Sequence, residues 1–152
     1  MSVPRDALFI TLAAGVGIAG AVAFSTMNSG VAETPAVFAE VEGLTQALSA
    51  SGETGKPAVV LVTADWCPPC QKLKKDTLVD ERVTTWLDEN AVAVTLVDGQ
   101  NNDDIARLPM RAFPTTFVIR GETIVGQLEG YRGPEGYLSF LEGAVESPAE
   151  PG

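Results

Sequence analysis

Histidine is absent from the 152-residue sequence, and cysteine occurs only twice. Without an imidazole the chain has no Ser–His or Cys–His catalytic couple and no histidine ligand for zinc or copper. Two cysteines cannot by themselves complete a tetrahedral four-cysteine site within one chain. Gln71 follows Cys70, where a haem-attachment motif would need histidine. These absences exclude most metal, haem and hydrolase chemistry.

Basic residues are also scarce. The chain has 10 Lys and Arg against 20 Asp and Glu, a formal net charge of −10. No basic stripe is available to displace counterions from phosphates, which argues against a nucleic-acid partner. Length and apolar content are typical of one globular domain with appendages. A domain of about 100 residues can bury a core without cross-links, so the two cysteines are not needed as structural staples.

Residues 7–24 are uncharged and almost wholly apolar. As a helix this segment would be about 27 Å long, near the lower limit for crossing a bilayer. Arg5 precedes it and no Lys or Arg follows until Lys56. The positive-inside rule therefore predicts a cytoplasmic N-terminus with the rest of the chain across the membrane. Residues 21–23 and 30–32 also fit the small-x-small pattern of signal cleavage, so the segment is either a retained anchor, which we favour, or an export signal.

The sequence thus divides into five parts. They are a cytoplasmic stub at 1–6, a transmembrane anchor or signal segment at 7–24, a linker at 25–34, a globular domain at 35–146 and a flexible tail at 147–152.

Apolar periodicity predicts an alternation of helices and strands in the domain. Two continuous apolar runs joined by a helix require a right-handed parallel crossover, and a later hairpin adds antiparallel strands. The prediction is an α/β fold with a mixed central sheet and helices on both faces. The expected elements are a helix at 36–51, a strand at 58–62, helical turns at 68–90 broken near 79–80, a strand at 91–97, a short helix at 101–108 capped by its Asn and Asp cluster, strands at 115–119 and 123–128, and a helix from Pro134 with Leu138, Leu141 and Val145 on one face.

Cys67 and Cys70 lie where a buried strand ends and a helix begins. Free amides and the positive dipole end of a helix favour a thiolate, lowering the pKa of Cys67 from its usual value of about 8.5. Cys70, one turn further on, is expected to be more shielded. Pro68 and Pro69 lack N–H donors, which costs nothing in a first helical turn, and they stiffen the loop. The pattern predicts a redox dithiol with Cys67 as nucleophile and Cys70 as resolving thiol.

The Cys-x-x-Cys pair has two other interpretations. A structural disulfide explains neither the small loop nor its placement between strand and helix. A Cu(I) site using both thiolates is disfavoured because no methionine or histidine stands near Cys67. Lys72, Lys74 and Lys75 follow on the helix. They are either a source of positive charge that favours the thiolate or solvated surface lysines, and we expect the second.

The segment from Trp66 to Cys70, followed by Phe113-Pro114-Thr115, resembles the thioredoxin superfamily over about residues 35–145. Residues 64–67 and 72–77 look most similar to the periplasmic thioredoxin-like domain of the bacterial transmembrane thiol:disulfide interchange reductase. The resemblance implies a thioredoxin fold at 35–146 and no cofactor beyond the redox-active disulfide. It also implies a cis Pro114 beside the dithiol, with Phe113 presenting its backbone to an extended substrate segment and Gly130 nearby. Seven residues are thereby expected to shape the substrate site: Trp66, Pro68, Pro69, Phe113, Pro114, Thr115 and Gly130.

The sequence departs from the family pattern at Leu61. Thioredoxins usually carry a buried Asp six positions before the first cysteine, and the lysine that often accompanies it aligns with Val94. Help from a buried carboxylate is therefore absent. We expect deprotonation of Cys70 to depend on water or on Asp65, which is itself expected to face solvent.

These observations predict a thiol–disulfide oxidoreductase of the protein-disulfide reductase type. It would reduce disulfides of other envelope proteins in the bacterial periplasm, be tethered to the inner membrane or exported, be recharged by a membrane electron donor, and act as a monomer. An oxidase or isomerase is the alternative, because the residues between the cysteines do not set the direction of exchange. A non-catalytic Cu(I)-binding module is less favoured.

Overall fold

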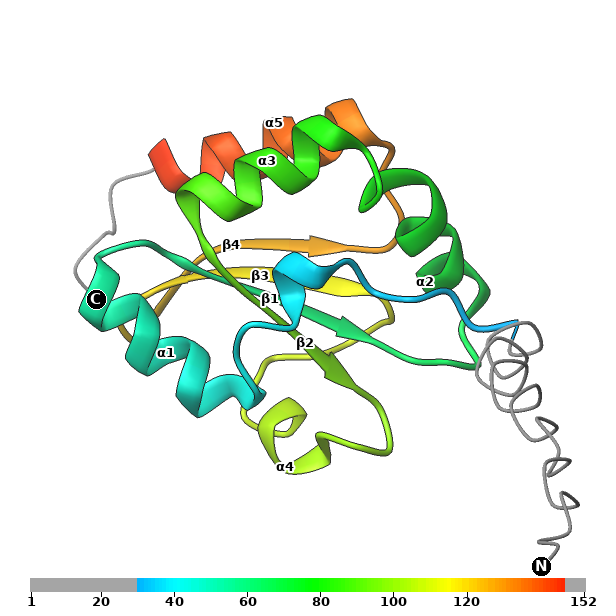
Figure 1. The fold of residues 1–152 in the computed structure, drawn as a ribbon. Coiled ribbons are helices and arrows are strands. Elements are labelled where there is room, and N and C mark those ends of the chain that lie inside the picture. Colours follow the sequence, from blue (N-terminus) through cyan, green and yellow to red (C-terminus); the bar gives the residue numbers. More distant parts are fainter. Residues whose placement is uncertain (1–29, 147–152) are drawn as a thin grey trace, which may run out of the picture. The chain divides into compact units, whose positions relative to one another are not determined.

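The computed structural model describes residues 30–146 (Figure 1). The predicted anchor or signal segment at 7–24 and the tail at 147–152 lie outside the described residues. A four-stranded sheet in the order β2-β1-β3-β4 forms the centre of the domain. The strands are β1 (Ala58–Thr63), β2 (Val92–Val97), β3 (Thr115–Arg120) and β4 (Thr123–Glu129). β1 pairs in parallel with β2, whereas β1–β3 and β3–β4 are antiparallel.

Helices cover both faces of this sheet. α3 and α5 lie side by side over one face, α1 and α4 lie against the other, and α2 begins at the end where β1 finishes (Figure 1). The mixed sheet with helices on both faces, predicted from the sequence, is confirmed. The helical elements are η1 (Ala36–Phe38), α1 (Gly43–Thr54), α2 (Pro68–Lys72), η2 (Leu73–Thr77), α3 (Glu81–Asn90), α4 (Asn102–Ile105) and α5 (Pro134–Glu146).

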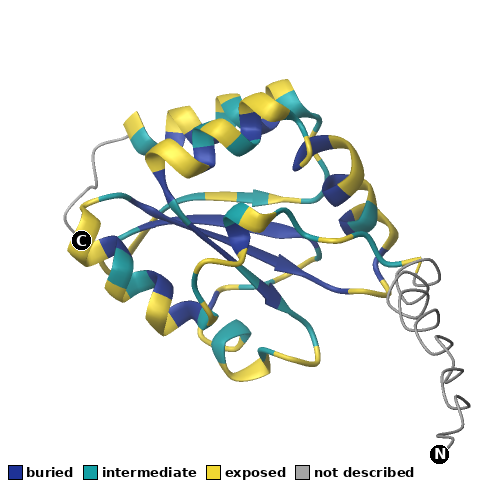
Figure 2. Ribbon diagram, viewed as in Figure 1, coloured by how far each residue is buried: buried dark blue, intermediate teal, exposed yellow. Residues whose placement is uncertain are grey.

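β1 is buried along its whole length, which explains why its sequence is a continuous apolar run (Figure 2). Val59 and Leu61 belong to the core under α3 and α5. Val60 and Val62 point the other way, into the core under α1. One strand therefore contributes to both hydrophobic layers. Because it is fixed on both faces, it also fixes the position of the residues that follow Thr63 at the carboxyl end of the strand.

The single helix predicted at 36–51 is wrong. The structure has a short 3₁₀ turn, η1, and a separate helix that begins at Gly43. Phe38 packs into the core on the α3 and α5 side, whereas Leu44 packs into the core on the α1 side, so one straight helix cannot place both. Gly43 makes the break with a φ of 78°, a conformation that other residues rarely adopt.

The predicted short helix at 101–108 is also wrong in extent and in its capping. α4 covers Asn102–Ile105, and Asn101 makes no side-chain cap. Its Oδ1 instead accepts a hydrogen bond of 2.9 Å from the Val97 amide, and Asn102 Oδ1 accepts one of 2.8 Å from Gly99. The two asparagine side chains therefore hold the turn after β2 and do not cap α4.

The other predicted elements agree with the structure to within a residue or two. In α5 the predicted Leu141 is buried, but its buried companions are Tyr137 and Ala144, with Leu138 and Val145 only partly buried. Within residues 30–146, no helix is long and apolar enough to cross a bilayer.

Candidate active site

Cys67 and Cys70 form a disulfide at the point where the chain leaves β1 and enters α2. Their Cα atoms are 5.3 Å apart. Cys67 is the N-cap of the helix, and its Sγ accepts a hydrogen bond of 3.3 Å from the backbone amide of Cys70. An amide donor aimed at sulfur stabilises negative charge there, so this geometry favours a thiolate on Cys67 once the disulfide is reduced.

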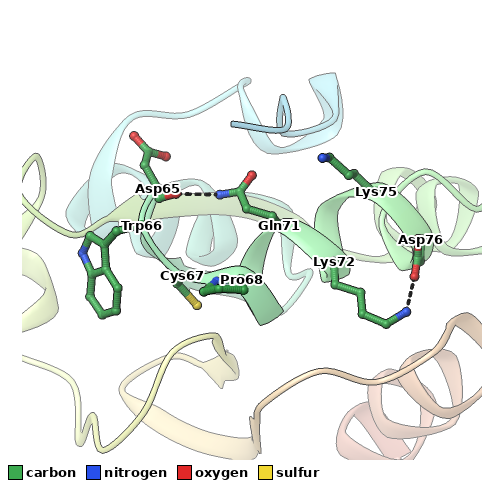
Figure 3. Close-up of a pocket in the computed structure, with 8 residues that line it drawn as sticks. All are labelled: Asp65, Trp66, Cys67, Pro68, Gln71, Lys72, Lys75 and Asp76. Atoms are coloured by element: carbon green, nitrogen blue, oxygen red, sulfur yellow. Dashed lines mark hydrogen bonds and ion pairs between the residues drawn. The ribbon is translucent and has the colours of Figure 1, made fainter. Parts of the chain in front are cut away.

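Both cysteines are almost fully buried, with 2% of Cys67 and 1% of Cys70 exposed. The expected difference in overall shielding is therefore negligible in the disulfide form. The two sulfurs still differ in where they face. Cys67 lines a surface hollow of about 480 Å³ (Figure 3). Cys70 is not among the residues that line this hollow. Pro68 and Pro69 occupy the first turn of α2 as predicted, and both are exposed.

The hollow beside Cys67 combines an apolar wall with charged groups (Figure 3). Lys72 makes an ion pair with Asp76, and its Nζ lies 4.3 Å from the centroid of the Tyr131 ring. The hydrogen bond to Asp76 raises the pKa of Lys72 above its usual value. The residues that line the hollow are Asp65, Trp66, Cys67, Pro68, Gln71, Lys72, Lys75 and Asp76.

Trp66 is the most exposed large apolar residue of the described chain, at 68%. Its ring is nevertheless fixed by two contacts. Nε1 donates a hydrogen bond of 3.0 Å to Asp98 Oδ2, and the ring meets Phe113 edge to face with centroids 5.6 Å apart. Phe113 also packs against the cluster of Ala64 and the two cysteines. An aromatic surface is thus held open to solvent next to the disulfide.

The Phe113–Pro114 peptide bond is cis, and Pro114 is buried at the start of β3. The Pro114 carbonyl accepts a hydrogen bond of 2.8 Å from the amide of Gly130, which has a φ of 80°. Thr115 is buried, and its hydroxyl donates a hydrogen bond of 2.8 Å to the Ala112 carbonyl. The structure therefore links Gly130, Pro114 and Phe113, and through Phe113 connects them to the disulfide.

Gln71 was not singled out from the sequence as a site residue, yet it holds the loop before Cys67. Its Nε2 donates to the carbonyls of Asp65 (3.2 Å) and Ala64 (3.5 Å). Its Oε1 accepts a hydrogen bond of 2.6 Å from the amide of Ala32. One side chain thus ties together the helix, the loop after β1 and the segment that enters the domain.

Leu61 is fully buried in an apolar cluster with Leu73, so no carboxylate stands behind the dithiol at this position. Asp65 is exposed, as expected. The prediction for Lys74 is wrong, because this lysine is only 3% exposed. Burial lowers the pKa of Lys74 below its usual value, and the nearby negative charge of Asp65 partly opposes that change.

Gln71 and Asp98 were not predicted from the sequence as residues of the site, and the burial of Lys74 was not predicted either. A signal for Asp98 did exist. β1 and β2 run parallel, so the residues that follow them emerge at the same edge of the sheet. Lys74 lies four residues after Cys70, which is the spacing of one helical face. Nothing in the sequence pairs Gln71 with Ala32.

Between residues 30 and 146, no three His, Cys, Asp or Glu side chains lie close enough together to hold a metal ion. A disulfide at a helix N-terminus, a cis-proline loop and a mixed sheet define a thiol–disulfide oxidoreductase-like domain of thioredoxin fold.

Comparisons with known proteins agree with this class. The family model described as "Thioredoxin-like domain" matches residues 44–144, about two thirds of the chain, and the chain therefore belongs to this family. It is 27% identical over 99 residues to protein disulfide isomerase-like 1-1 of Arabidopsis thaliana, covering 64% of this chain and 19% of the plant protein. The chain thus spans about a fifth of the length of that relative.

Solved structures share the fold. The DsbH oxidoreductase aligns with a TM-score of 0.63 at 17% identity, covering 82% of this chain and 94% of that one. A thioredoxin from Thermus thermophilus gives 0.61 at 21% identity, with coverage of 68% and 85%. A putative disulphide-isomerase from Bacteroides thetaiotaomicron gives 0.59 at 23% identity, with coverage of 70% and 91%.

Proposed function

We propose that this protein is an extracytoplasmic thiol–disulfide oxidoreductase that reduces disulfides in other proteins of the bacterial envelope through Cys67 and Cys70. The observation that carries the proposal is the disulfide at the start of α2, with the Cys70 amide donating to Cys67 Sγ. No cofactor is needed, because the two thiols hold the two electrons that are transferred.

The proposed reaction has two exchange steps. The Cys67 thiolate attacks a partner disulfide, forms a mixed disulfide and releases one partner thiolate. The Cys70 thiolate then attacks Cys67 Sγ, closes the internal disulfide and releases the second partner thiolate. Cys67 takes the first role because it is the cysteine that lines the hollow. An electron donor in the membrane would return the disulfide to the dithiol.

The substrate segment is proposed to lie across Trp66 and the cis-proline loop. Trp66 and Pro68 offer exposed apolar surface, and the buried Pro114 and Thr115 hold the start of β3 in place. Phe113 is partly exposed, and its backbone is proposed to pair with an extended chain as in an added strand. Gly130 has no side chain to obstruct that approach. The space that a Cβ would occupy there is open, with no atom within 4 Å of it.

The proposed location rests on residues 7–24 and on the resemblance to the periplasmic domain of the transmembrane interchange reductase. A retained anchor would keep a monomeric domain at the membrane, close to its electron donor. Carbonate extraction and external protease treatment of cells that express the full chain test this proposal. A full-length product that resists extraction and is cut only from outside supports it, and a soluble, protected product contradicts it.

Trapping tests the exchange mechanism directly. In the full chain, Cys70→Ser should accumulate mixed disulfides with envelope proteins, because the resolving step is lost. Cys67→Ser, which leaves one equally buried cysteine, is the matched control and should capture none. Non-reducing electrophoresis followed by identification of the captured proteins gives the readout. If the Cys70→Ser protein captures no more than the control, the proposed function fails.

The direction of exchange is tested by the reduction potential of the pair in glutathione buffers. A value near −270 mV, as in thioredoxin, supports a reductase. A value between about −180 and −120 mV supports the second candidate, an oxidase or isomerase. The named relatives favour keeping that candidate, since two of them carry disulfide isomerase in their descriptions.

A further inference from the structure

Lys74 is a largely buried lysine that the exchange mechanism above does not use. It is 3% exposed, which is rare for lysine unless the charge is paired. Within residues 30–146 its Nζ has no hydrogen-bond or ion-pair partner within 4 Å, although the negative charge of Asp65 acts on it from a greater distance. Its Nζ is not among the fully buried, unpartnered polar atoms of these residues, so the ammonium keeps contact with solvent, and burial of the rest of the side chain lowers its pKa.

The helix geometry directs this cation toward the dithiol. Lys74 lies four residues after Cys70, in the π-helical turn η2 that continues α2, and both residues are buried against the core on the same side of this segment. Long side chains on a helix lean toward its N-terminus, the end where the cysteines and Asp65 lie. The interaction between Lys74 and Asp65 agrees with that direction, because Asp65 stands in the loop before the helix.

No other charged side chain is buried in the core next to the two cysteines in the described chain. Leu61 and Leu73 fill this part of the core with apolar side chains. Thr63 follows Leu61 on the same face of β1, and its buried hydroxyl has no partner among the described residues. Among the buried residues of the described chain, Lys74 is therefore the one with an ionisable charge near the dithiol.

We propose that Lys74 is a positioning residue that stabilises the thiolates of the reduced dithiol and so sets the balance between the dithiol and the disulfide. The inference rests on the proposed redox function of Cys67 and Cys70. The disulfide offers the ammonium no counter-ion, whereas reduction creates a thiolate on the same helix face. The favourable interaction exists only in the reduced protein, so Lys74 makes the disulfide a stronger oxidant than it would otherwise be.

The resolving step shows the same effect. When Cys70 ionises, its proton goes to solvent water and Lys74 keeps its own proton. The Cys70 thiolate then attacks Cys67 Sγ, the Cys67–Cys70 bond forms, and the bond from Cys67 to the partner breaks with release of the partner thiolate. A cation beside Cys70 increases the fraction that is ionised at a given pH.

Other charges around this segment have to be separated from the effect of Lys74. On the segment itself Lys72 is paired with Asp76, and Lys75 is exposed. The loop before α5 and the start of α5 pack against it and bring Arg132 and Glu135, while Glu33 lies in the segment bound to Gln71. The control must therefore be a variant that removes one positive charge elsewhere in the chain, as Lys74→Met does at Lys74.

The experiment equilibrates four full-length proteins with glutathione buffers: wild type, Lys74→Met, Lys74→Arg and the control Lys56→Met. We expect Lys74→Met to shift the equilibrium toward the disulfide by about tenfold, which corresponds to about 30 mV. Lys74→Arg, which keeps the cation, and Lys56→Met, which removes a partly exposed charge outside the hollow, should both stay near wild type. Ultraviolet thiolate absorbance should show the Cys67 titration in Lys74→Met about one pH unit higher.

A measurement on the wild-type protein does not depend on the folding of any variant. NMR titration of ¹³C-lysine-labelled protein should show a higher pKa of Lys74 in the dithiol form than in the disulfide form. Equal pKa values in the two forms, or an equal shift in Lys74→Met and Lys56→Met, overturn the inference and leave the proposed function intact. A wild-type pair that does not equilibrate with glutathione at all overturns both.

Discussion

Trp66 Nε1 and Asp98 Oδ2 are joined by a hydrogen bond of 3.0 Å that connects the loop after β1 to the turn after β2. The bond spans 32 positions in the sequence and anchors the most exposed apolar ring of the described chain. A flexible tryptophan would pay conformational entropy each time it contacted a substrate. The bond to Asp98 removes part of that cost in advance.

Asp98→Ala should weaken reactions with protein substrates more than reactions with small thiols. The unfolding free energy should fall by no more than about 1 kcal/mol, because the bond is exposed. The rate of mixed-disulfide formation with a protein substrate should fall about threefold to tenfold, since the docking surface is less well positioned. Stopped-flow kinetics check this, with Asp103→Ala as the control at another exposed aspartate in the next element. Equal rates for Asp98→Ala and wild type would contradict a positioning role for Asp98.

Gln71→Ala should destabilise the domain by about 1 to 2 kcal/mol, because it leaves the carbonyls of Ala64 and Asp65 and the Ala32 amide without their protein partner. Urea unfolding of the full chain measures the change. Gln127→Ala is the matched control, since the Gln127 amide bonds only the exposed Glu129 carboxylate and its loss should change the unfolding free energy by less than about 0.5 kcal/mol. A Gln71→Ala midpoint equal to that of the control would refute the contribution of these three bonds.

Gly126→Ala should cost about 1 to 3 kcal/mol of stability, because a methyl group there would lie 2.6 Å from Ala144 Cβ and 3.3 Å from the Phe140 ring. α5 would have to move away from β4. The same change at Gly52, in α1, meets nothing within 4 Å and should stabilise the protein by about 0.5 to 1 kcal/mol. Thermal or urea denaturation of the two variants should therefore give shifts of opposite sign, and shifts of the same sign would show that α5 adjusts freely.

Tyr137 makes stability depend on alkaline pH. Complete burial raises the pKa of its hydroxyl to about 12, with the hydrogen bond to Thr116 opposing the change. The unfolded chain releases this proton near its ordinary pKa of 10 and the folded chain does not, so stability is lost as pH rises from about 10 to about 12. The loss should total about 2 to 3 kcal/mol.

Tyr137→Phe should remove that part of the pH dependence. It should also lower the unfolding free energy at every pH, because the Thr116 hydroxyl loses its hydrogen bond. Tyr131→Phe changes a partly exposed ring and should keep the dependence, because Tyr137 is still present. Urea unfolding at several pH values between 9 and 12 provides the measurement. Parallel curves for wild type and Tyr137→Phe would contradict the assignment to Tyr137.

Local patterns predicted the elements whose faces are uniform. β1 is apolar throughout and buried throughout, and the dithiol was expected at its end because strand, proline pair and helix follow without interruption. The region before α1 was mispredicted because Phe38 and Leu44 have helical spacing but serve opposite faces of the sheet. The spacing of apolar residues along the chain predicts a helical period, but it does not predict on which face of the sheet each residue packs.

The parts of the site that escaped prediction depend on contacts across the fold. Asp98 meets Trp66 because two parallel strands end together, and Gln71 reaches Ala32 across 39 positions. Lys74 was expected in solvent from its residue type, because lysine is seldom buried without a partner. Its burial follows from the helix face that it shares with Cys70 and Leu73, which packing against the sheet decides.

The near-complete burial of both cysteines has a kinetic consequence. A small thiol in solution would reach Cys67 Sγ only through the part of the sulfur that borders the hollow, so few of its encounters would be productive. Under the proposed function, a protein that rests on the Trp66 surface would bring its own disulfide to that opening and hold it there at an effective concentration that free glutathione does not reach. Discrimination among disulfides would then arise from the reaction rates, through the time that a partner spends bound, even where the equilibrium constants of exchange are alike.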